Sequence, residues 1–196
     1  MPATRLKLIV VLAGVVLSGL TLLSWSQTWF LVSLSGEASA DHVIEVGGDV
    51  AAPALAALSL AGLALVGALS IAGPVFRIIL GALETAIGVS VVLSAALALL
   101  SPVAASAPLV TKATGVSGVD SVASLVNSVG QTPWPILALV LGAGACALGI
   151  VIIATWRRWP RASRKYQATR FEPEAGSDAS MSDWDTLSDG TDPTSR

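Results

Sequence analysis

The sequence predicts an all-α membrane protein with four transmembrane helices and a polar C-terminal tail. Of its 196 residues, 54% are hydrophobic and only 12% are charged, whereas a soluble domain usually carries about 25% charged residues. The charges are also segregated, and the apolar stretches between them are long enough to cross a bilayer. We therefore divide the chain into a membrane domain at 1–160 and a basic juxtamembrane segment with an acidic, disordered tail at 161–196.

The first transmembrane helix is expected at about residues 6–28. Arg5 and Lys7 stand before an apolar run that extends from Leu8 to Leu23. A cleaved signal peptide is the alternative, but no suitable cleavage site follows the run directly, so we expect the helix to be retained.

Two tryptophans, Trp25 and Trp29, mark the far end of this helix. Aromatic rings are enriched at the level of the lipid headgroups, so the pair is interpreted as an interface anchor. The sharper alternative is that these rings stack on an aromatic ligand at the outer mouth of the helix bundle.

The second and third helices are expected at about residues 51–72 and 76–100. A Gly-Pro pair lies between them and ends the second helix, so the two helices must form an antiparallel hairpin. The third helix holds Glu84, the only acidic residue within the apolar blocks, and Arg77 lies two turns earlier on the same face. These two residues are the candidate functional residues inside the membrane.

Glu84 is expected to face the interior of the bundle, because a charged side chain near the bilayer centre costs about 3 kcal/mol. Equal counts of residues from the cytoplasmic helix ends place Gly14, Gly67 and Gly149 at its level, which predicts a glycine-lined layer. One interpretation is a structural carboxyl that fixes the helix register. The other is a carboxyl that handles a proton or a ligand.

The polar connections at 31–49 and 103–133 are expected on the opposite side of the membrane. In the first, the alternation in HVIEV at 42–46 indicates a short strand. In the second, valines at near-helical spacing indicate a weak amphipathic helix at about 118–129, resting on the membrane surface or over the bundle. We interpret the second connection as an ordered loop without function, with a ligand lid as the alternative.

The fourth helix is expected at about residues 134–156 and runs into a basic stretch that contains two tryptophans. Such a stretch is typical of an interfacial anchor, in which cations lie beside anionic lipid headgroups. The expected lipid contacts are Arg157, Arg158, Arg161, Arg164 and Lys165. Nucleic-acid binding is not expected, because the stretch directly follows a membrane helix.

The distribution of cations predicts that both termini lie in the cytoplasm, since Lys and Arg concentrate in cytoplasmic segments. Among the cations that flank the four helices, only Lys112 then lies outside. Those on the inside are Arg5, Lys7, Arg77, Arg157, Arg158, Arg161, Arg164, Lys165 and Arg170.

The tail from Phe171 onward is acidic and rich in Ser, Thr, Asp and Gly, with too little apolar surface to fold alone. Trp184 and Leu187 are the exceptions, and their spacing would place both on one face of a helical turn. That turn would form on the surface of a cytosolic partner, with Trp184 as its buried anchor. The plainer interpretation is a solubilising tail with an incidental tryptophan.

The sequence carries no enzyme motif. It contains one cysteine and one histidine without further metal ligands at helical spacing. It also contains no phosphate-binding loop, no dinucleotide fingerprint and no nucleophile motif. We therefore expect no catalytic residue, no metal and no cofactor.

Several features together resemble one family. They are the four-helix layout, Trp25 with Trp29, VGGDVAAPALAALSLAGLAL at 46–65, the exit marked by Trp156, Trp159 and Tyr166, and WDTLSDGTDPT at 184–194. In these the chain resembles the tryptophan-associated transmembrane proteins, bacterial membrane proteins encoded alongside tryptophan-biosynthesis genes. The resemblance implies no known reaction. It maps a tail motif onto Trp184, Asp185, Leu187, Gly190, Asp192, Pro193 and Thr194, with Asp189 where the family pattern has a basic residue.

The resemblance and the residues together lead to one expected function. The chain is expected to be a multi-pass protein of the bacterial cytoplasmic membrane that serves tryptophan biosynthesis as a scaffold or regulatory partner. Its tail would recruit a cytosolic protein of the tryptophan pathway. The alternative is a small transporter component for tryptophan or an aromatic intermediate. Four spans are few for a stand-alone carrier, and assembly as a homo-oligomer would remove that objection.

Overall fold

The computed structural model describes residues 3–35 and 43–158. These residues all belong to one compact unit, which spans Met1–Arg161. The predicted features of the tail, Trp184, Leu187, Asp192 and Pro193, lie outside the described residues, as do Arg161, Arg164 and Lys165 of the basic stretch.

Within these described ranges, four helices are long and apolar enough to cross a membrane, which confirms the predicted fold class. They are α1 (Ala3–Trp25), α3 (Ala54–Ile71), α4 (Pro74–Leu100) and α7 (Trp134–Thr155). At about 1.5 Å per residue, the 18 residues of α3 measure about 27 Å and the 27 residues of α4 about 40 Å. Both suit a hydrocarbon core of about 30 Å. A short 3₁₀ turn, Trp156–Arg158, follows α7.

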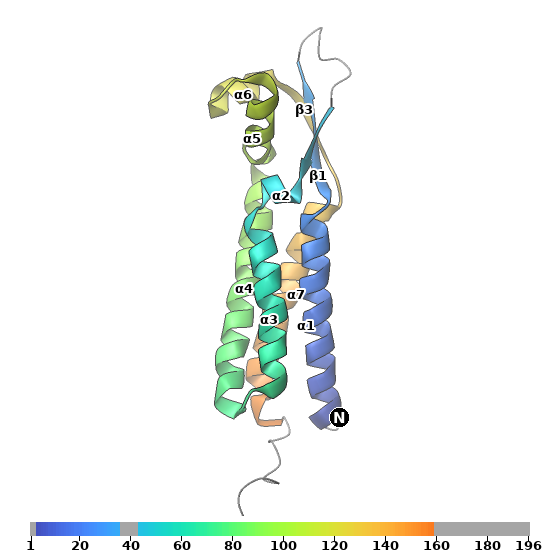
Figure 1. The fold of residues 1–196 in the computed structure, drawn as a ribbon, viewed down its shortest axis with the longest axis vertical. Coiled ribbons are helices and arrows are strands. Elements are labelled where there is room, and N and C mark those ends of the chain that lie inside the picture. The colour runs from blue at the N-terminus through green and yellow to red at the C-terminus, as the bar shows by residue number, and fades with distance from the viewer. Residues whose placement is uncertain (1–2, 36–42, 159–196) are drawn as a thin grey trace, which may run out of the picture. The chain divides into compact units, whose positions relative to one another are not determined.

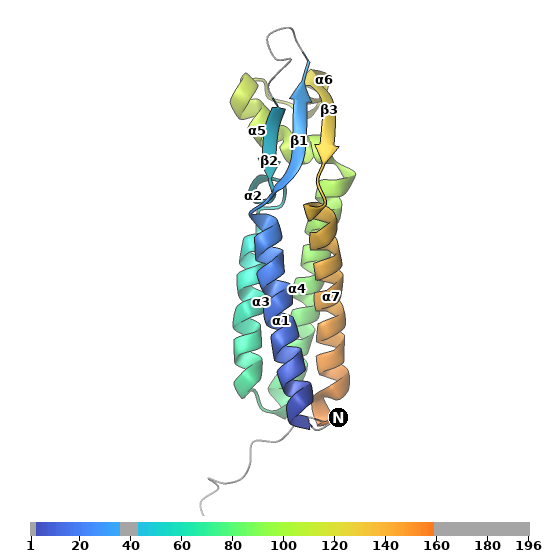
Figure 2. The ribbon, with the colours of Figure 1, turned by 90° about the vertical axis from the view of Figure 1, so that its right-hand side faces the viewer.

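The four long helices form a ring in which each contacts two neighbours (Figures 1 and 2). Helices α3 and α4 make the predicted antiparallel hairpin, α1 packs on α3 and α7, and α7 closes the ring against α4. The contact between α4 and α7 is the most extensive of these.

Glycines explain why α4 and α7 approach so closely. A Cβ atom added at Gly88 of α4 would lie 2.5 Å from the backbone nitrogen of Cys146. One added at Gly142 of α7 would lie 2.9 Å from the backbone nitrogen of Val92. Because small residues at these positions let two helix backbones touch, the pair is held by backbone-to-backbone packing.

A small layer of strands and short helices covers the end of the bundle opposite the α3–α4 connection (Figure 1). We call it the outer layer because it lies at one end of the molecule, beyond the spanning helices. Its sheet has the order β2-β1-β3 and both pairings are antiparallel. The strands are β1 (Thr28–Leu34), β2 (Val43–Gly47) and β3 (Val126–Gln131), and the helices are α2 (Gly48–Ala51), α5 (Pro102–Thr114) and α6 (Val119–Leu125). The largest core cluster of the described residues lies here and continues into the outer ends of α3, α4 and α7.

A β-bulge at Trp29 builds the centre of this layer. Thr28 pairs with Gly47 and Phe30 with Val46, so the extra residue Trp29 has no partner of its own on β2. A bulge turns successive side chains to the same face of a strand. As a result Trp29 and Phe30, at 0% and 1% exposed, both point into the core.

The layer differs from the sequence prediction in several places. The strand expected at 42–46 is confirmed as β2, but the first helix ends at Trp25 and β1 begins where the helix was expected to continue. The helix expected at 118–129 is confirmed only at 119–125, because its second half is β3. The connection at 103–133 is not only a loop, because α5 occupies its first part. This helix has a proline in its first turn and is followed by Gly115, whose φ of +72° ends it.

Candidate functional site

Glu84 lies in the interior of the bundle, with 1% of its surface exposed. It lines a small cavity to which all four spanning helices contribute. Ser18 and Thr21 come from α1, Ser59 from α3 and Gly142 from α7. The space open to the centre of a water molecule is about 10 Å³, which is about the minimum for one water. The predicted inward orientation of Glu84 is therefore what the structure has.

Three hydroxyl groups line this cavity, and two of them donate their hydrogens to backbone carbonyl oxygens of their own helices. The Thr21 hydroxyl donates to the carbonyl oxygen of Leu17 at 2.8 Å, and the Ser59 hydroxyl donates to that of Leu55 at 2.6 Å. Such bonds to the preceding helical turn leave the oxygen lone pairs available as acceptors. One carboxyl oxygen of Glu84, Oε2, is buried and has no hydrogen-bond partner among the described residues.

The predicted glycine layer does not line the cavity. Gly14 faces Val66, and a side chain at Gly67 would meet nothing within 4 Å. Gly149 packs on Gly81 and Thr85 of α4, close to the level of Glu84 but outside the cavity lining. Equal counting fails because it assumes that the helices begin at one height. On α1 and α3 the residues that line the cavity with Glu84 lie three or more positions farther from those helix ends than Gly14 and Gly67 do.

Arg77 is also buried, with 5% of its surface exposed. It lies on the same face of α4 as Glu84, together with Gly81 and Gly88, as the spacing predicts. It is not among the residues that line the cavity. The two candidate intramembrane residues therefore occupy different layers of the bundle.

The two tryptophans expected at the outer mouth have different positions. Trp29 is completely buried and its indole N–H donates to the carbonyl oxygen of Ser24 at 2.8 Å. Its ring meets that of Phe30 edge to face, with 6.5 Å between the centroids. Trp25, at the end of α1, is partly buried and packs against the same core. Trp29 is thus a core residue of the outer layer and offers no open face to lipid or ligand.

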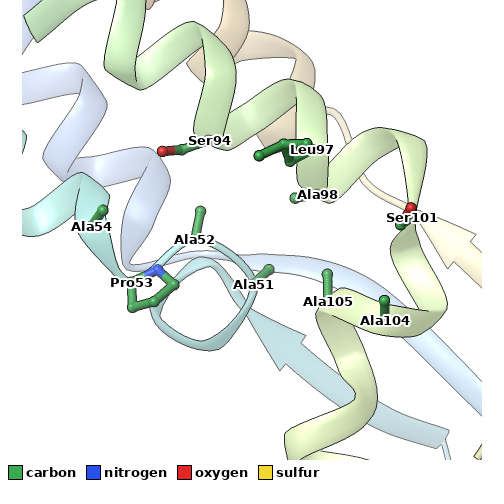
Figure 3. A pocket seen from close by; sticks show the side chains of 10 residues that line it. All are labelled: Ala51, Ala52, Pro53, Ala54, Ser94, Leu97, Ala98, Ser101, Ala104 and Ala105. Atoms are coloured by element: carbon green, nitrogen blue, oxygen red, sulfur yellow. The ribbon is translucent and has the colours of Figure 1, made fainter. Parts of the chain in front are cut away.

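A larger cavity that the sequence did not indicate lies where α3 begins, α4 ends and α5 begins (Figure 3). Its volume is about 370 Å³. The lining consists of Ala51, Ala52, Pro53, Ala54, Ser94, Leu97, Ala98, Ser101, Ala104 and Ala105. None of these side chains is charged, so the lining offers no charged partner for the ammonium or carboxylate group of a free amino acid. Its small side chains form no motif, so no sequence pattern indicates this cavity.

The cations of the described residues separate between the two ends of the unit. Arg5 and Lys7 lie near the start of α1 and Arg77 lies near the start of α4, at the end with the α3–α4 connection. There Lys7 donates to the carbonyl oxygen of Ser70 at 2.6 Å. Arg157 lies at the same end, over the ring of Trp156 at 5.0 Å from its centroid. Lys112 lies on α5 in the outer layer.

Comparison with known proteins gives one family. No curated protein and no solved structure matches the chain. The model of the tryptophan-associated transmembrane proteins matches residues 11–194, which include most of α1, the other three spanning helices, the outer layer and nearly all of the acidic tail. With its four spanning helices and a match over nearly all of its length, the chain belongs to the tryptophan-associated transmembrane protein family.

Proposed function

We propose that this protein is a scaffold or regulatory partner for tryptophan biosynthesis in the bacterial cytoplasmic membrane. The observation that carries the proposal is the closed interior of the bundle. The cavity at its centre, about 10 Å³, holds about one water molecule and is far too small for an indole ring. Because the described residues leave no room for such a ring inside the bundle, we propose that the protein acts through its surfaces.

The distribution of cations supports a cytosolic role for the tail. The positive-inside rule places the end with Arg5, Lys7, Arg77 and Arg157 in the cytoplasm. Both termini then lie on the cytosolic side, and the layer built on β1, β2 and β3 lies outside. Trp156 and the basic stretch that starts at Arg157 would hold the last helix at anionic lipid headgroups.

The tail supplies the surface for a partner. The family match continues to residue 194, so the segment with Trp184 and Leu187 belongs to the matched pattern. In an acidic segment of low apolar content, these two side chains are the natural anchor for a protein surface. We propose that they dock a cytosolic enzyme or regulator of the tryptophan pathway.

Full-length protein extracted from its membrane should co-purify with one of the tryptophan-pathway enzymes, each probed individually. The double variant Trp184→Ala, Leu187→Ala should lose at least about 90% of that recovery, because truncating anchor residues costs 2 kcal/mol or more of binding free energy in typical interfaces, roughly a thirtyfold loss of affinity. Phe171→Ala removes an aromatic ring from the same tail outside the docking segment, and it should leave recovery unchanged.

Two results would contradict the docking hypothesis. One is equal recovery by wild type and the double variant. The other is a tail outside the cytosol, which is checked with a cysteine placed at Ser163 in a Cys146→Ala background. A membrane-impermeant thiol reagent should reach it only after the cells are made permeable.

A second candidate is a component of a transporter for tryptophan or an aromatic intermediate. The 370 Å³ cavity beside α3, α4 and α5 favours it, because this volume lies in the range of small-molecule sites, about 300–1,000 Å³. Its uncharged lining suits a neutral ring more than an amino acid. A homo-oligomer would be needed to extend this lateral cavity into a path through the membrane.

A further inference from the structure

The cavity beside Glu84 has the composition of a cation site. Every polar side chain that lines it carries only oxygen: the carboxyl of Glu84 and the hydroxyls of Ser18, Thr21 and Ser59. No lysine, arginine or histidine is among the lining residues, which come from all four spanning helices. Among the described residues, Glu84 is therefore the only titratable group that faces the cavity. It is residue 11 of the 27 in α4, about 15 Å from the start of that helix, and so lies within the membrane.

Two of the three hydroxyl groups that line the cavity cannot donate to the atoms it leaves open. Thr21 and Ser59 use their hydrogens on Leu17 and Leu55, so their oxygens can only accept. Oε2 of Glu84 is buried without a hydrogen-bond partner among the residues described. An unpaired buried carboxyl oxygen is costly, and native structures usually satisfy such an atom with a ligand, a water or an ion.

Packing around Ser18 keeps its hydroxyl at this site. Gly62 of α3 faces it so closely that a Cβ atom at position 62 would lie 2.6 Å from the Ser18 oxygen. The glycine thus makes room for a polar side chain in an otherwise apolar contact between α1 and α3. A hydroxyl group accommodated in this way adds a further oxygen to the wall of the cavity.

We propose that this cavity is an occluded binding site for one small monovalent cation, either Na⁺ or a proton. Oxygen ligands are those that hard cations prefer. A single positive charge neutralises the one carboxylate, whereas a divalent ion would leave a net charge buried in the bundle. About 10 Å³ of space also excludes the several waters that Mg²⁺ keeps.

The site predicts a stabilising effect of the bound ion, because its ligands belong to four different helices. An ion that binds only the folded bundle stabilises it by mass action. The thermal stability of the purified full-length protein in detergent is measured in NaCl, KCl and choline chloride at equal ionic strength, and at several pH values in choline chloride. If Na⁺ is the occupant, NaCl should raise the melting temperature by about 5 °C or more over choline at a hundredfold excess over Kd. If a proton is the occupant, the melting temperature should rise toward acidic pH and should not depend on Na⁺.

Variants test whether the dependence of the melting temperature on Na⁺ or on pH arises at this cavity. Glu84→Gln removes the charge with little change of shape and should abolish the ion or pH dependence. Thr21→Val and Ser59→Ala keep Glu84, so they should weaken the dependence even where Glu84→Gln does not fold. Ser90→Ala is the matched control. Ser90 is on the same helix as Glu84 and its hydroxyl donates to the carbonyl oxygen of Ala86 one turn earlier, as that of Ser59 does to Leu55, but Ser90 does not line the cavity.

Three outcomes would overturn the proposal. The first is a wild-type stability that depends on neither Na⁺ nor pH, as expected for a cavity that holds only water. The second is equal stabilisation by NaCl, KCl and choline chloride without a pH effect. The third is an ion or pH dependence that persists at full size in both Glu84→Gln and Thr21→Val.

Discussion

Gly88→Ala should destabilise the helix bundle by about 3 kcal/mol, at the upper end of the usual cost of overpacking. The added methyl group would lie 2.5 Å from the backbone nitrogen of Cys146 and 2.8 Å from the carbonyl oxygen of Gly142. Backbone atoms cannot rotate away as a side chain can, so α4 and α7 would have to separate along their closest contact. The melting temperature of the purified protein in detergent measures the effect.

Gly19→Ala is the control for this substitution. A Cβ atom at Gly19 would meet nothing within 4 Å, and alanine is the better helix former by about 1 kcal/mol. This variant should therefore match or exceed the wild-type melting temperature. Equal melting temperatures for Gly88→Ala and Gly19→Ala would show that the close α4–α7 contact does not exist in the protein.

Trp29→Ala should destabilise the outer layer by about 3–5 kcal/mol, the cost of removing a large aromatic side chain from a packed core. Trp29 is completely buried at the bulge in β1 and holds both a hydrogen bond to Ser24 and an edge contact with Phe30. We expect protease to cut this layer in the variant at concentrations that leave the wild type intact. The spanning helices should keep their membrane insertion.

Two further variants test whether the effect of Trp29→Ala comes from the burial of this side chain. Leu31→Ala changes a side chain that is 38% exposed on the other face of the same strand, so it should cost less than about 1 kcal/mol. Trp29→Phe keeps an aromatic ring but loses the donor to Ser24, and should cost an intermediate amount. If Trp29→Ala were no more sensitive to protease than Leu31→Ala, Trp29 would be at a surface, as the sequence suggested.

The sequence predicts the spanning helices well because each is a long apolar run. In a membrane, a helix satisfies all the backbone hydrogen bonds of such a run within the run itself. The sheet was harder to predict. Strand β3 at 126–131 pairs with β1, about one hundred residues earlier, and local spacing carries no information about such a partner. The bulge at Trp29 also turns two successive aromatic side chains inward, so the alternation that identifies a strand is broken there.

The site was predictable only in part for a similar reason. A single acid in an apolar run has to face the interior, and Glu84 does. Its neighbours Ser18, Thr21 and Ser59 depend on the relative heights of three other helices, which helix ends do not fix. Single serines and threonines are also common in membrane helices, where they bond to the preceding turn, so they do not stand out in the sequence.

Transport in a strain that lacks this gene separates a membrane scaffold from a transporter most directly. If the protein is a scaffold, the initial rates of tryptophan and anthranilate uptake and efflux should equal those of the parent strain. Growth without tryptophan should be slower, and the wild-type gene should restore it, whereas a gene carrying Trp184→Ala and Leu187→Ala should not. A changed rate of uptake or efflux that both genes restore equally would contradict the proposed function and assign the protein to transport.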